Sequence, residues 1–589
     1  MHNDGPSPRF TLGHWLILLA ALVIGLFIPF ALWLGITGAI AADSMQKAKS
    51  DIARAQAAVA NQNDAQVREL VPAITGSTSS AHAMVSGPVW NTARRLPFVG
   101  ATASALTDSI TAVDIAAQGA LLPLSAAIAQ VRSGSLLDSD GSINLAQLSG
   151  LQRPMNAAAA AITEASALAS AAPKTGVVDS VASETENVAT QLTGLRHQIL
   201  AVGEATEVLP SMLGRQDRQR YFVAFTSPAE ARGTGGFLGT FGILNADKGK
   251  LSVERLGSNT ELNDFTAPVV DLGEEYTRLY SNNSALWSGM NLSPHFPFAA
   301  KQWIEGWKRQ TGEQLQGALA VDPATLSYLM GVTGPITLPD GEPLTSTDVV
   351  PFLANGVYQR FASDNAARKK FQVTVADRAI NGLIAGEAHP QLILTAMARA
   401  ASERRLLVYS ADPTVQRVIE QWPLSGIVDT TPGPYAMLVV NNLAGNKADY
   451  FLDRSLTYRQ VSCGSPRVDS QITAILTNNL PPSGNAPAVI YRGDPGAGVA
   501  KPLSTRVSAE ILLPIGAGIT SATLNGEEVP IASISEAGRP GTVFSLDLER
   551  AKPVTLLLNI REPVSVSEPR VPVQPLVRPQ LTAVSRLSC

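Results

Sequence analysis

An uncharged apolar stretch near the start of the chain constrains its fold most. No charged side chain stands between Trp15 and Ala42, and most of these 28 residues are apolar. About 20 such residues suffice to cross the hydrocarbon core of a bilayer as a helix. Pro29 would kink this helix, which a bilayer tolerates, and Trp33 falls near its far end, where indole rings favour the interface. We therefore expect a transmembrane anchor at residues 15–42.

A cleaved signal peptide is the alternative, because Ala39–Ala41 resembles a small-residue cleavage site. The apolar run is longer than the roughly 7–15 residues of a signal peptide, which favours a retained anchor. Lys47 and two further cations follow the run, whereas only Arg9 precedes it, so flanking charge is mildly contrary to export of the tail. A short head before a long tail still predicts a single-pass cell-membrane protein. Residues 1–14 would be cytoplasmic and the bulk extracytoplasmic.

Length and composition bound the remaining classes. A chain of 589 residues exceeds what one hydrophobic core organises, so about two to four domains are expected. The net charge is −4, 16% of residues are charged and no long Lys/Arg run occurs, which argues against a nucleic-acid partner. Two cysteines are too few for a disulfide-dense scaffold or a cysteine zinc site. Cys463 and Cys589 could form one bridge in an oxidising compartment or remain two unpaired thiols.

Patterning divides the chain after the anchor into three regions. Residues 43–215 show apolar steps of 3, 4 and 7 between Val181 and Val202, which predicts a helical bundle or stalk. Residues 216–445 mix strand runs and helical stretches, which predicts an α/β domain. Residues 446–589 contain short strand runs punctuated by Gly, Pro and Asn, which predicts a β-sandwich with a proline-rich C-terminal arm. The expected fold class is therefore multi-domain α+β.

Common catalytic motifs are absent from the sequence. It contains no G-x-x-x-x-G-K-[ST], no G-x-S-x-G and no H-E-x-x-H. Its six histidines show no ligand spacing, which argues against a histidine metal site or a histidine-centred triad. Gly493–Gly498 (GDPGAG) resembles a phosphate loop only superficially, because it stands between strand runs and not before a helix. The sequence therefore identifies no metal ligands and no catalytic residues.

The segment Ser227–Thr240 (SPAEARGTGGFLGT) is the most distinctive part of the chain. It follows a strand run and combines Glu230 and Arg232 with several glycines, including Gly235 and Gly236. Glycines let backbone amides approach an anion, and an arginine fork binds phosphate oxygens. The alternative is a structural glycine-rich turn in which Arg232 forms an ion pair with Glu230. The residues alone favour neither interpretation.

The same segment resembles the domain-of-unknown-function family 4012 (DUF4012), which is found in exported bacterial proteins and is common in actinobacteria. The resemblance covers most of the chain and depends on an ordered set of motifs. These are Trp90–Gly100, Tyr221–Gly239, Ser293–Pro297 (SPHFP), Gly317–Pro323 (GALAVDP), Thr333–Pro335 and Asn446–Tyr450 (NKADY). The family has no settled activity, so the resemblance implies export to the cell envelope but no reaction.

A weaker similarity, in the order of elements, is to the LytR-CpsA-Psr phosphotransferases. These enzymes attach polyprenyl-pyrophosphate-linked glycopolymers to peptidoglycan. The similarity implies an α/β domain of that type, in which Arg232 and Arg255 lie near pyrophosphate-binding arginines. Arg360, Asp364 and Arg368 resemble the basic helix of those enzymes.

Two functions follow from these patterns. The first is an extracytoplasmic enzyme or binder of a lipid-linked pyrophosphate glycan, in which Glu230 or Asp364 would position a magnesium ion or accept a proton. The second is a non-catalytic envelope scaffold that binds glycan or protein. Convergence of Arg232, Arg255 and Arg368 on one cleft would support the first function, and wide separation would exclude it.

Overall fold

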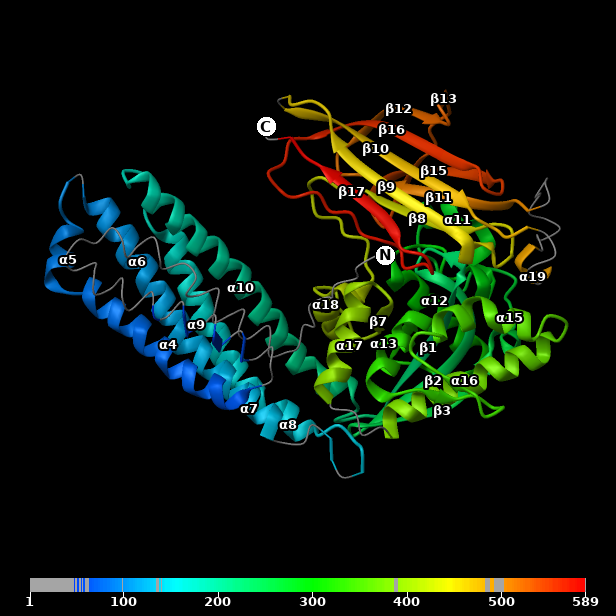
Figure 1. Cartoon of the computed structure of the whole chain (residues 1–589), viewed down its shortest axis with the longest axis horizontal. Helices are drawn as coiled ribbons and strands as arrows, with labels where there is room; N and C mark the ends of the chain where they lie inside the picture. The colour runs from blue at the N-terminus through cyan, green and yellow to red at the C-terminus, as the bar shows by residue number, and fades with distance from the viewer. Residues whose placement is uncertain are drawn as a thin grey trace. The chain divides into compact units, whose positions relative to one another are not determined.

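The computed structural model divides into two compact units, whose elements Figure 1 colours along the chain. Unit 1 runs to Arg218 and includes Asp247–Lys250 and a short stretch that ends at Thr395, and unit 2 comprises the remainder. Helices and several sheets are both present, so the multi-domain α+β class is confirmed. The structure describes residues 47, 50, 51, 54, 55, 57, 58, 63–97, 99–133, 137, 138, 140–385, 390–464, 466–482, 488–491 and 503–587.

Four predicted features lie outside the described residues. They are the anchor at 15–42, the head at 1–14, the loop Gly493–Gly498 and the last cysteine, Cys589. Cys463 is described and is disulfide-bonded. The alternative of an unpaired thiol is therefore excluded at Cys463.

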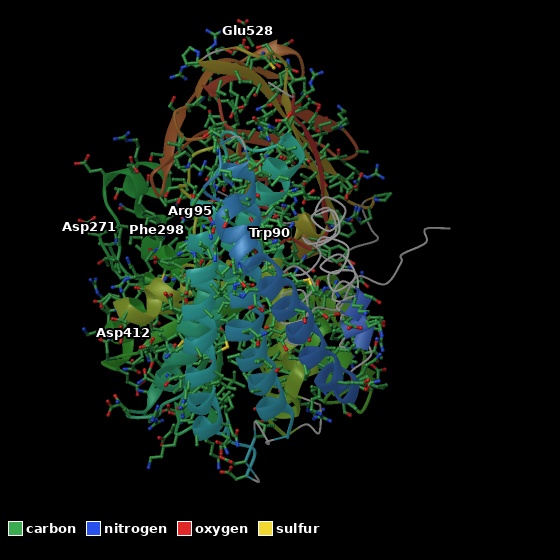
Figure 2. All side chains as sticks on the ribbon, turned by 90° about the vertical axis from the view of Figure 1, so that its left-hand side faces the viewer. Trp90, Arg95, Asp271, Phe298, Asp412 and Glu528 are labelled. Atoms are coloured by element: carbon green, nitrogen blue, oxygen red, sulfur yellow. The ribbon has the colours of Figure 1, made fainter. Side chains whose placement is uncertain are left out.

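Unit 1 is built from helices whose small side chains permit close packing. Between residues 63 and 218, its described helices are α4 (Asp64–Val85), α5 (Pro88–Ala93), α6 (Gly100–Ala116), η1 (Ala117–Leu121), α7 (Leu122–Ser133), α8 (Leu145–Gly150), α9 (Gln152–Ala171) and α10 (Asp179–Met212). Gly119 of η1 lies so near α9 that an added Cβ would stand 2.4 Å from the Ala161 Cβ. The apolar stripe expected between Val181 and Val202 lies in the shared core of these helices, and Trp90, labelled in Figure 2, packs against it.

One described helix, Gly100–Ala127, is long and apolar enough to span a membrane. In its most apolar window 56% is buried within the protein, so helix packing accounts for this apolarity. The helix also contains Asp114, whose carboxylate accepts from the Thr78 hydroxyl at 2.9 Å and contacts His82 Nδ1 at 3.1 Å. Both features fit a core helix of unit 1.

Unit 2 contains a five-stranded sheet with the strand order β3-β2-β1-β4-β7. Its strands are β1 (Gln219–Arg232), β2 (Gly235–Asp247), β3 (Lys250–Ser258), β4 (Gly317–Val321) and β7 (Leu406–Ser410). β1 pairs antiparallel with β2 and parallel with β4, and β4 pairs antiparallel with β7. The glycine-rich segment therefore forms the tip of the β1–β2 hairpin, where Arg232 pairs with Gly235.

Aromatic side chains join this sheet to its helices. The Phe222 ring of β1 lies 5.8 Å from that of Phe241 in β2 and 5.7 Å from that of Trp303 in helix α12 (Phe296–Thr311), and all three are fully buried. The described helices that follow β3 in the chain are η2 (Asn259–Glu261), α11 (Glu274–Tyr280), η3 (Ser281–Ala285), η4 (Trp287–Gly289), α12 (Phe296–Thr311), α13 (Pro323–Thr333), α14 (Val349–Pro351), η5 (Phe352–Gly356), α15 (Val357–Arg360), α16 (Asn365–Ala385), α17 (Pro390–Ser402), α18 (Pro413–Ile419), η6 (Pro423–Ser425), η7 (Ala448–Phe451) and α19 (Ala488–Tyr491).

Two further sheets of unit 2 share a second core. Their orders are β13-β12-β16-β10-β9-β17 and β14-β15-β11-β8. Leu456 and Leu558 of the first sheet and Val440 and Ile511 of the second are buried together. The strands of these two sheets are β8 (Met437–Asn442), β9 (Leu452–Gln460), β10 (Arg467–Asn478), β11 (Thr505–Leu512), β12 (Gly518–Leu524), β13 (Glu527–Glu528), β14 (Ser533–Glu536), β15 (Arg539–Leu548), β16 (Pro553–Pro563) and β17 (Gln580–Ser585). The short strands β5 (Ile336–Thr337) and β6 (Pro343–Leu344) form a separate two-stranded sheet.

The position of β8 differs from the predicted division of the chain. This strand lies in the region 216–445, yet it pairs with β11 and not with the five-stranded sheet. A strand run shows where a strand forms, but it carries no information about a partner far away in the sequence. β17 pairs in parallel with β9, so the proline-rich arm brings the end of the chain back to the sheet edge.

Candidate functional site

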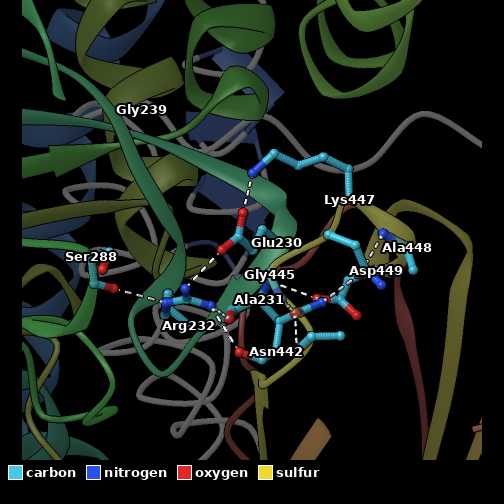
Figure 3. Close-up of polar contacts among 12 residues, drawn as sticks. Glu230, Ala231, Arg232, Gly239, Ser288, Asn442, Gly445, Lys447, Ala448 and Asp449 are labelled. Atoms are coloured by element: carbon cyan, nitrogen blue, oxygen red, sulfur yellow. Dashed lines mark hydrogen bonds and ion pairs between the residues drawn. The ribbon is translucent and has the colours of Figure 1, made fainter. Parts of the chain in front are cut away.

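A buried carboxylate lies between two cations at the end of β1. Glu230 Oε1 accepts a hydrogen bond from Arg232 Nη2 at 2.8 Å, and Glu230 Oε2 accepts one from the ammonium group of Lys447. Figure 3 shows the two cations reaching the carboxylate from opposite sides. Glu230, Arg232 and Lys447 are only 5%, 7% and 7% exposed. Charges are retained in a protein interior when they are paired and hydrogen-bonded in this way.

The other nitrogens of Arg232 are also used within the chain. Nε donates to the Ser288 carbonyl oxygen at 3.0 Å, and Nη1 donates to the carbonyl oxygens of Ala231 at 2.9 Å and Asn442 at 3.2 Å. The ion pair with Glu230 that the sequence suggested is present. A phosphate ligand on Arg232 would have to replace bonds that hold β1 to its neighbours.

A second buried carboxylate connects the end of β1 to β8. Asp449, in η7, accepts from the Ala231 backbone N–H at 2.7 Å and from Asn442 Nδ2 at 2.8 Å. Burial raises the pKa of Asp449 to about 6. Lys447 and Asp449 are 217 and 218 residues from their partners in β1, so this network forms only when distant parts of unit 2 have come together.

Burial and pairing act in opposite directions on Glu230. Burial penalises its ionised form, but Lys447 and Arg232 together outweigh that penalty and hold the pKa of Glu230 below its ordinary value. Burial likewise penalises the charged form of Lys447, but the nearby Glu230 keeps the pKa of Lys447 raised. Both groups are ionised at neutral pH, and Glu230 is poorly suited to accept a proton.

Two further cations, Arg368 and Lys369 of α16, lie beside this network, and we call them the α16 cation pair. Lys369 Nζ donates to Asn259 Oδ1 at 2.5 Å and to the Gly239 carbonyl oxygen at 3.3 Å. Burial, followed by repulsion from Lys447 and Arg368, lowers the pKa of Lys369 to about 7. Lys369 is thus held near a group of like charge.

Tyr358 of α15 lies between Arg368 and Lys447. The guanidinium carbon of Arg368 is 4.7 Å from the centroid of the Tyr358 ring, and Lys447 Nζ is 5.9 Å from the same centroid. Lys447 Nζ also stands 4.7 Å from the centroid of the Phe237 ring. Cations gain electrostatic attraction from such ring faces. Arg368 Nε, by contrast, is buried without a hydrogen-bond partner.

The α16 cation pair differs from Arg232 and Lys447 in having neutral contacts. Arg368 Nη2 donates to Asn365 Oδ1, and the two acceptors of Lys369 are an amide oxygen and a backbone carbonyl. Both side chains of the pair are half-buried. An arginine fork beside a lysine ammonium is an arrangement that binds phosphate oxygens.

The glycines of the predicted anion cradle are required by packing. An added Cβ at Gly236 would stand 2.4 Å from the backbone carbon of Ser227. Gly235 has a φ of +127°, and its added Cβ would meet Pro575 Cγ at 3.1 Å. Other parts of the chain therefore fill the space next to these glycines. The structure supports the structural glycine-rich turn and not ligand contacts at Gly235 and Gly236.

The remaining predicted site residues have separate partners. The guanidinium carbon of Arg255 stands 5.3 Å from the centroid of the Trp307 ring. Arg360 forms an ion pair with Asp340. Asp364 accepts a backbone N–H of the first turn of α16 at 2.8 Å and is exposed. These contacts are those of a stacked surface cation, a surface ion pair and a helix cap.

The predicted convergence of arginines is therefore partial. Arg368 and Lys447 both contact the Tyr358 ring, and Lys447 pairs with Glu230. Arg368 therefore lies beside the buried network of Glu230 and Arg232. Arg255 shares none of the described contacts of that network. A site built on three converging arginines does not describe this arrangement, whereas a site built on α16 and the end of β1 does.

Sequence reasoning missed Lys369, Lys447 and Asp449. A signal existed for the last two, because both stand in Asn446–Tyr450 (NKADY), a motif already singled out by its resemblance. Lys369 gave no signal, since a lysine beside other cations on a helix usually faces solvent.

The residues present do not fit the expected magnesium site. Both oxygens of Glu230 are occupied by cations, and Asp364 is a helix cap. In the part of the chain that the structure describes, no group of three or more His, Cys, Asp or Glu side chains could hold a metal ion. The structure therefore does not support a divalent metal on Glu230 or Asp364.

Comparison with known proteins identifies a family. Residues 216–358 match the model of the family described as Protein of unknown function (DUF4012), a stretch that includes Glu230, Arg232 and Tyr358. A search of curated proteins found no match. The similarity to the LytR-CpsA-Psr phosphotransferases stays a prediction. The DUF4012 resemblance is confirmed for residues 216–358, about a quarter of the chain, and the motifs Trp90–Gly100 and Asn446–Tyr450 lie outside this match.

Proposed function

We propose that this chain is a membrane-anchored, extracytoplasmic cell-envelope protein that binds a polyprenyl-pyrophosphate-linked glycopolymer by its phosphate groups. The α16 cation pair carries the proposal. Arg368 and Lys369 are half-buried cations with neutral partners, whereas Arg232 and Lys447 are already paired with Glu230. An anionic ligand would supply the missing counter-charge.

The predicted anchor adds to this proposal. A polyprenyl chain and a transmembrane helix at 15–42 would occupy the same bilayer, so an exported domain and its lipid-linked ligand would meet in two dimensions. In this proposal residues 43–215 form a stalk, residues 216–445 the binding domain and residues 446–589 a β-sandwich. The domain limits and the outward orientation are part of the proposal.

The geometry favours binding over transfer of the glycopolymer. Glu230 is a carboxylate of this region, but both of its oxygens accept from cations, Arg232 and Lys447, and its pKa is lowered. A general base needs a free oxygen and a pKa near the working pH. The site can therefore hold and orient a phosphate group, with Arg368 as a fork and Lys369 as a point charge.

The second candidate is an envelope scaffold that binds no phosphate. The internal hydrogen bonds of Arg232 favour it, because they give the buried network a purely structural role between β1 and β8. In that case the lowered pKa of Lys369 would be a tolerated cost of packing. A binding measurement on the α16 cation pair separates the two candidates.

The test is calorimetric titration of the full-length chain, in detergent, with inorganic pyrophosphate. We expect Lys369→Met to weaken binding by at least about tenfold, which corresponds to about 1.4 kcal/mol. Lys370→Met is the matched control, because it removes the same charge from the next, exposed position of α16, and it should weaken binding by less than about twofold. Equal losses in the two variants, or no binding by the wild type, would contradict the proposal.

A second readout follows the ammonium group itself. The pKa of Lys369 lies at about 7 without ligand, and bound pyrophosphate should raise it because a nearby anion favours the charged form. Carbon-13 NMR of the lysine ε-carbons, assigned with Lys369→Met, would follow this change. Repeating the titration with polyprenyl pyrophosphate tests the lipid, since tighter binding than to pyrophosphate alone requires contacts with the polyprenyl chain. A pKa of Lys369 that ignores both ligands would count for the scaffold.

A further inference from the structure

A cavity of about 520 Å³ lies on the face of the four-stranded sheet that points away from the shared core. The strands β8, β11, β14 and β15 form its floor, and α11 contributes to its wall. Small-molecule sites span about 300–1,000 Å³. Its polar lining includes Glu275, Arg278, Tyr280, Asn441, Ser508 and Glu510. This cavity shares no residue with the α16 cation pair.

Two buried carboxyl groups meet at this cavity through a tyrosine. The Tyr280 hydroxyl lies 2.6 Å from Glu536 Oε2 and 3.3 Å from Glu510 Oε2. The Ser293 hydroxyl donates to Glu536 Oε1 at 2.5 Å. Glu510 and Glu536 are only 2% and 1% exposed. Glu510 lines the cavity and is linked to Glu536 by the shared hydroxyl.

The groups that face the two carboxyls supply little positive charge. Within the described ranges neither Glu510 nor Glu536 forms an ion pair. Burial and then the negative charge of Glu275 raise the pKa of Glu536 to about 7, and burial and then Glu536 raise the pKa of Glu510 well above its ordinary value. Tyr276 packs on Tyr280 at 4.9 Å and is itself uncharged at neutral pH. The pair therefore holds protons that a cation in the cavity would displace.

An unsatisfied acceptor stands beside Glu510. Asn441 lines the cavity, is 2% exposed, and its Oδ1 is buried without a hydrogen-bond partner. Its Nδ2 is used, because it donates to the Leu292 carbonyl oxygen at 3.0 Å and approaches Glu510 Oε1 at 3.4 Å. Buried acceptors without donors are uncommon. Asn441 and Glu510 thus offer acceptors to a ligand that brings N–H donors.

We propose that this cavity binds a ligand through a primary ammonium group, held by the Glu510 carboxylate and the Asn441 side-chain oxygen. An ammonium group supplies three donors and a positive charge, which are the two things that this end of the cavity lacks. Arg278, on the exposed side of the cavity, would contact an acceptor group of the same ligand. The volume suits an amino sugar or a short peptide with a free amine, and these two sources share the proposed chemistry.

A neutral ligand and a metal ion fit less well. A hydroxyl group could donate to Asn441, but it would leave the charge of an ionised Glu510 unbalanced. Within the described residues no cluster of three acidic or histidine side chains could hold a metal. An ammonium group alone supplies both the donor and the charge.

The test uses matched pairs of probes on the full-length chain at about pH 6, where the amines are charged. Glucosamine is compared with N-acetylglucosamine, and glycinamide with N-acetylglycinamide, because each pair differs at the amine. We expect binding of at least one amine to be at least about tenfold tighter than that of its acetylated partner. The first pair reports an amino sugar and the second a peptide amine.

Proton release gives a signature that simple contact would not. An ammonium group next to Glu510 should drive ionisation of the carboxyl pair, so up to about one proton should leave to the buffer on binding. Titrations in two buffers of different ionisation enthalpy measure this number. Binding without proton release, or equal binding of the amine and the amide, would overturn the proposal, and so would failure of both amines to bind.

Variants assign the site. Glu510→Gln should weaken amine binding by at least about tenfold and abolish proton release. The variant should fold, because it replaces a buried acid by a neutral amide, and thermal melting curves would check this. Tyr280→Phe keeps both carboxyls and removes their shared hydroxyl, so it should change the proton count while amine binding persists.

Glu528→Gln is the matched control, because Glu528 is exposed on β13 (Figure 2) and should leave binding unchanged. Wild-type affinity in Glu510→Gln would exclude the cavity. Pyrophosphate binding at the α16 cation pair would be unaffected by these variants.

Discussion

Unit 2 contains two buried carboxylate clusters that have similar exposure and opposite electrostatics. Glu230 is 5% exposed and lies between two cations, whereas Glu510 and Glu536 are 2% and 1% exposed and lie beside each other. The pKa of Glu230 is lowered, and the pKa values of Glu510 and Glu536 are raised. Burial acts on all three in the same direction, so the difference comes from their partners.

This difference separates two uses of buried charge. The Glu230 network joins β1 to β8, and the charged groups of Glu230 and Arg232 are hydrogen-bonded within the chain, although Asp449 Oδ1 is buried without a partner. The Glu510–Glu536 pair leaves an acceptor of Asn441 unpaired at a cavity. A paired cluster has little capacity left for a ligand, whereas an unbalanced one gains stability when a ligand supplies the missing charge.

Removing the carboxylate of the paired cluster should have the largest effect. Glu230→Gln leaves the buried Arg232 and Lys447 without a counter-charge, and we expect a loss of about 3–5 kcal/mol in the free energy of unfolding of unit 2. Urea unfolding followed by near-ultraviolet circular dichroism would measure it. Glu305→Gln, in the exposed ion pair with Arg309, is the control and should cost less than about 0.5 kcal/mol. A loss below about 1 kcal/mol in Glu230→Gln would show that the network is not a charge-paired core.

The glycine-rich tip next to this cluster provides the second test. An added Cβ at Gly233 would stand 2.1 Å from the Leu292 carbonyl oxygen, so Gly233→Ala should destabilise unit 2 by about 2–3 kcal/mol through forced backbone shifts. Gly239→Ala is the matched control, because its nearest neighbour, the Phe225 carbonyl oxygen, is 3.6 Å away. The control should be neutral or slightly stabilising. Similar melting temperatures for both variants would mean that packing does not require the glycine at position 233.

Much of the fold could be predicted from local patterns. The mixture of helical stretches and strand runs expected over residues 216–445 is present, for example in α16 and β4, because helical periodicity and short apolar runs are local properties. The pairing of β8 with β11 could not be predicted, since it joins segments that are distant in sequence. Of the site, the ion pair of Glu230 with Arg232 could be anticipated because the two residues are close in sequence.

The carboxyl pair shows most clearly where such reasoning ends. Along β11, Glu510 alternates with buried apolar residues. This pattern indicates that Glu510 lies on the opposite face of the strand from those residues, and such a face is ordinarily expected to be exposed to solvent. In the structure that face is covered, and Tyr280 of α11 contacts Glu510 across it. Alternation identifies which side chains share a face, but it does not show what packs against that face. Burial of Glu510 is therefore a tertiary property that the sequence of β11 does not contain.

The pH dependence of stability should differ in sign between Glu230 and the Glu510–Glu536 pair. The raised pKa values of Glu510 and Glu536 mean that the folded chain keeps protons that the unfolded chain releases, so their contribution to stability falls as pH rises from about 4.5 to about 7. The lowered pKa of Glu230 gives the opposite contribution, which is lost as pH falls below about 4.5. Each retained proton contributes up to about 1.4 kcal/mol per pH unit.

Glu536→Gln isolates the unbalanced cluster in this measurement. The free energy of unfolding of the variant minus that of the wild type should increase between about pH 5 and about pH 7, by about 1–2 kcal/mol. Urea unfolding at several pH values gives the difference directly. Glu528→Gln, at an exposed position, should show no such trend. A flat difference for Glu536→Gln would mean that the carboxyl pair ionises in the folded chain without penalty.

Lys369 provides the smallest and most discriminating test, because it neighbours the paired cluster and yet behaves as an unbalanced charge. Its pKa is lowered to about 7 from 10.5, so the unfolded chain binds more protons and stability should rise with pH between these values. Lys369→Met should remove this rise of stability with pH. At about pH 7 it should stabilise unit 2 by less than about 1 kcal/mol, because the loss of the hydrogen bonds to Asn259 and Gly239 offsets part of the stability gained by removing the buried charge. Lys370→Met should retain the rise. If Lys369→Met instead destabilises unit 2 as strongly as Glu230→Gln does, the α16 cation pair belongs to the structural network. The distinction between a paired cluster and an adjacent anion site would then be wrong.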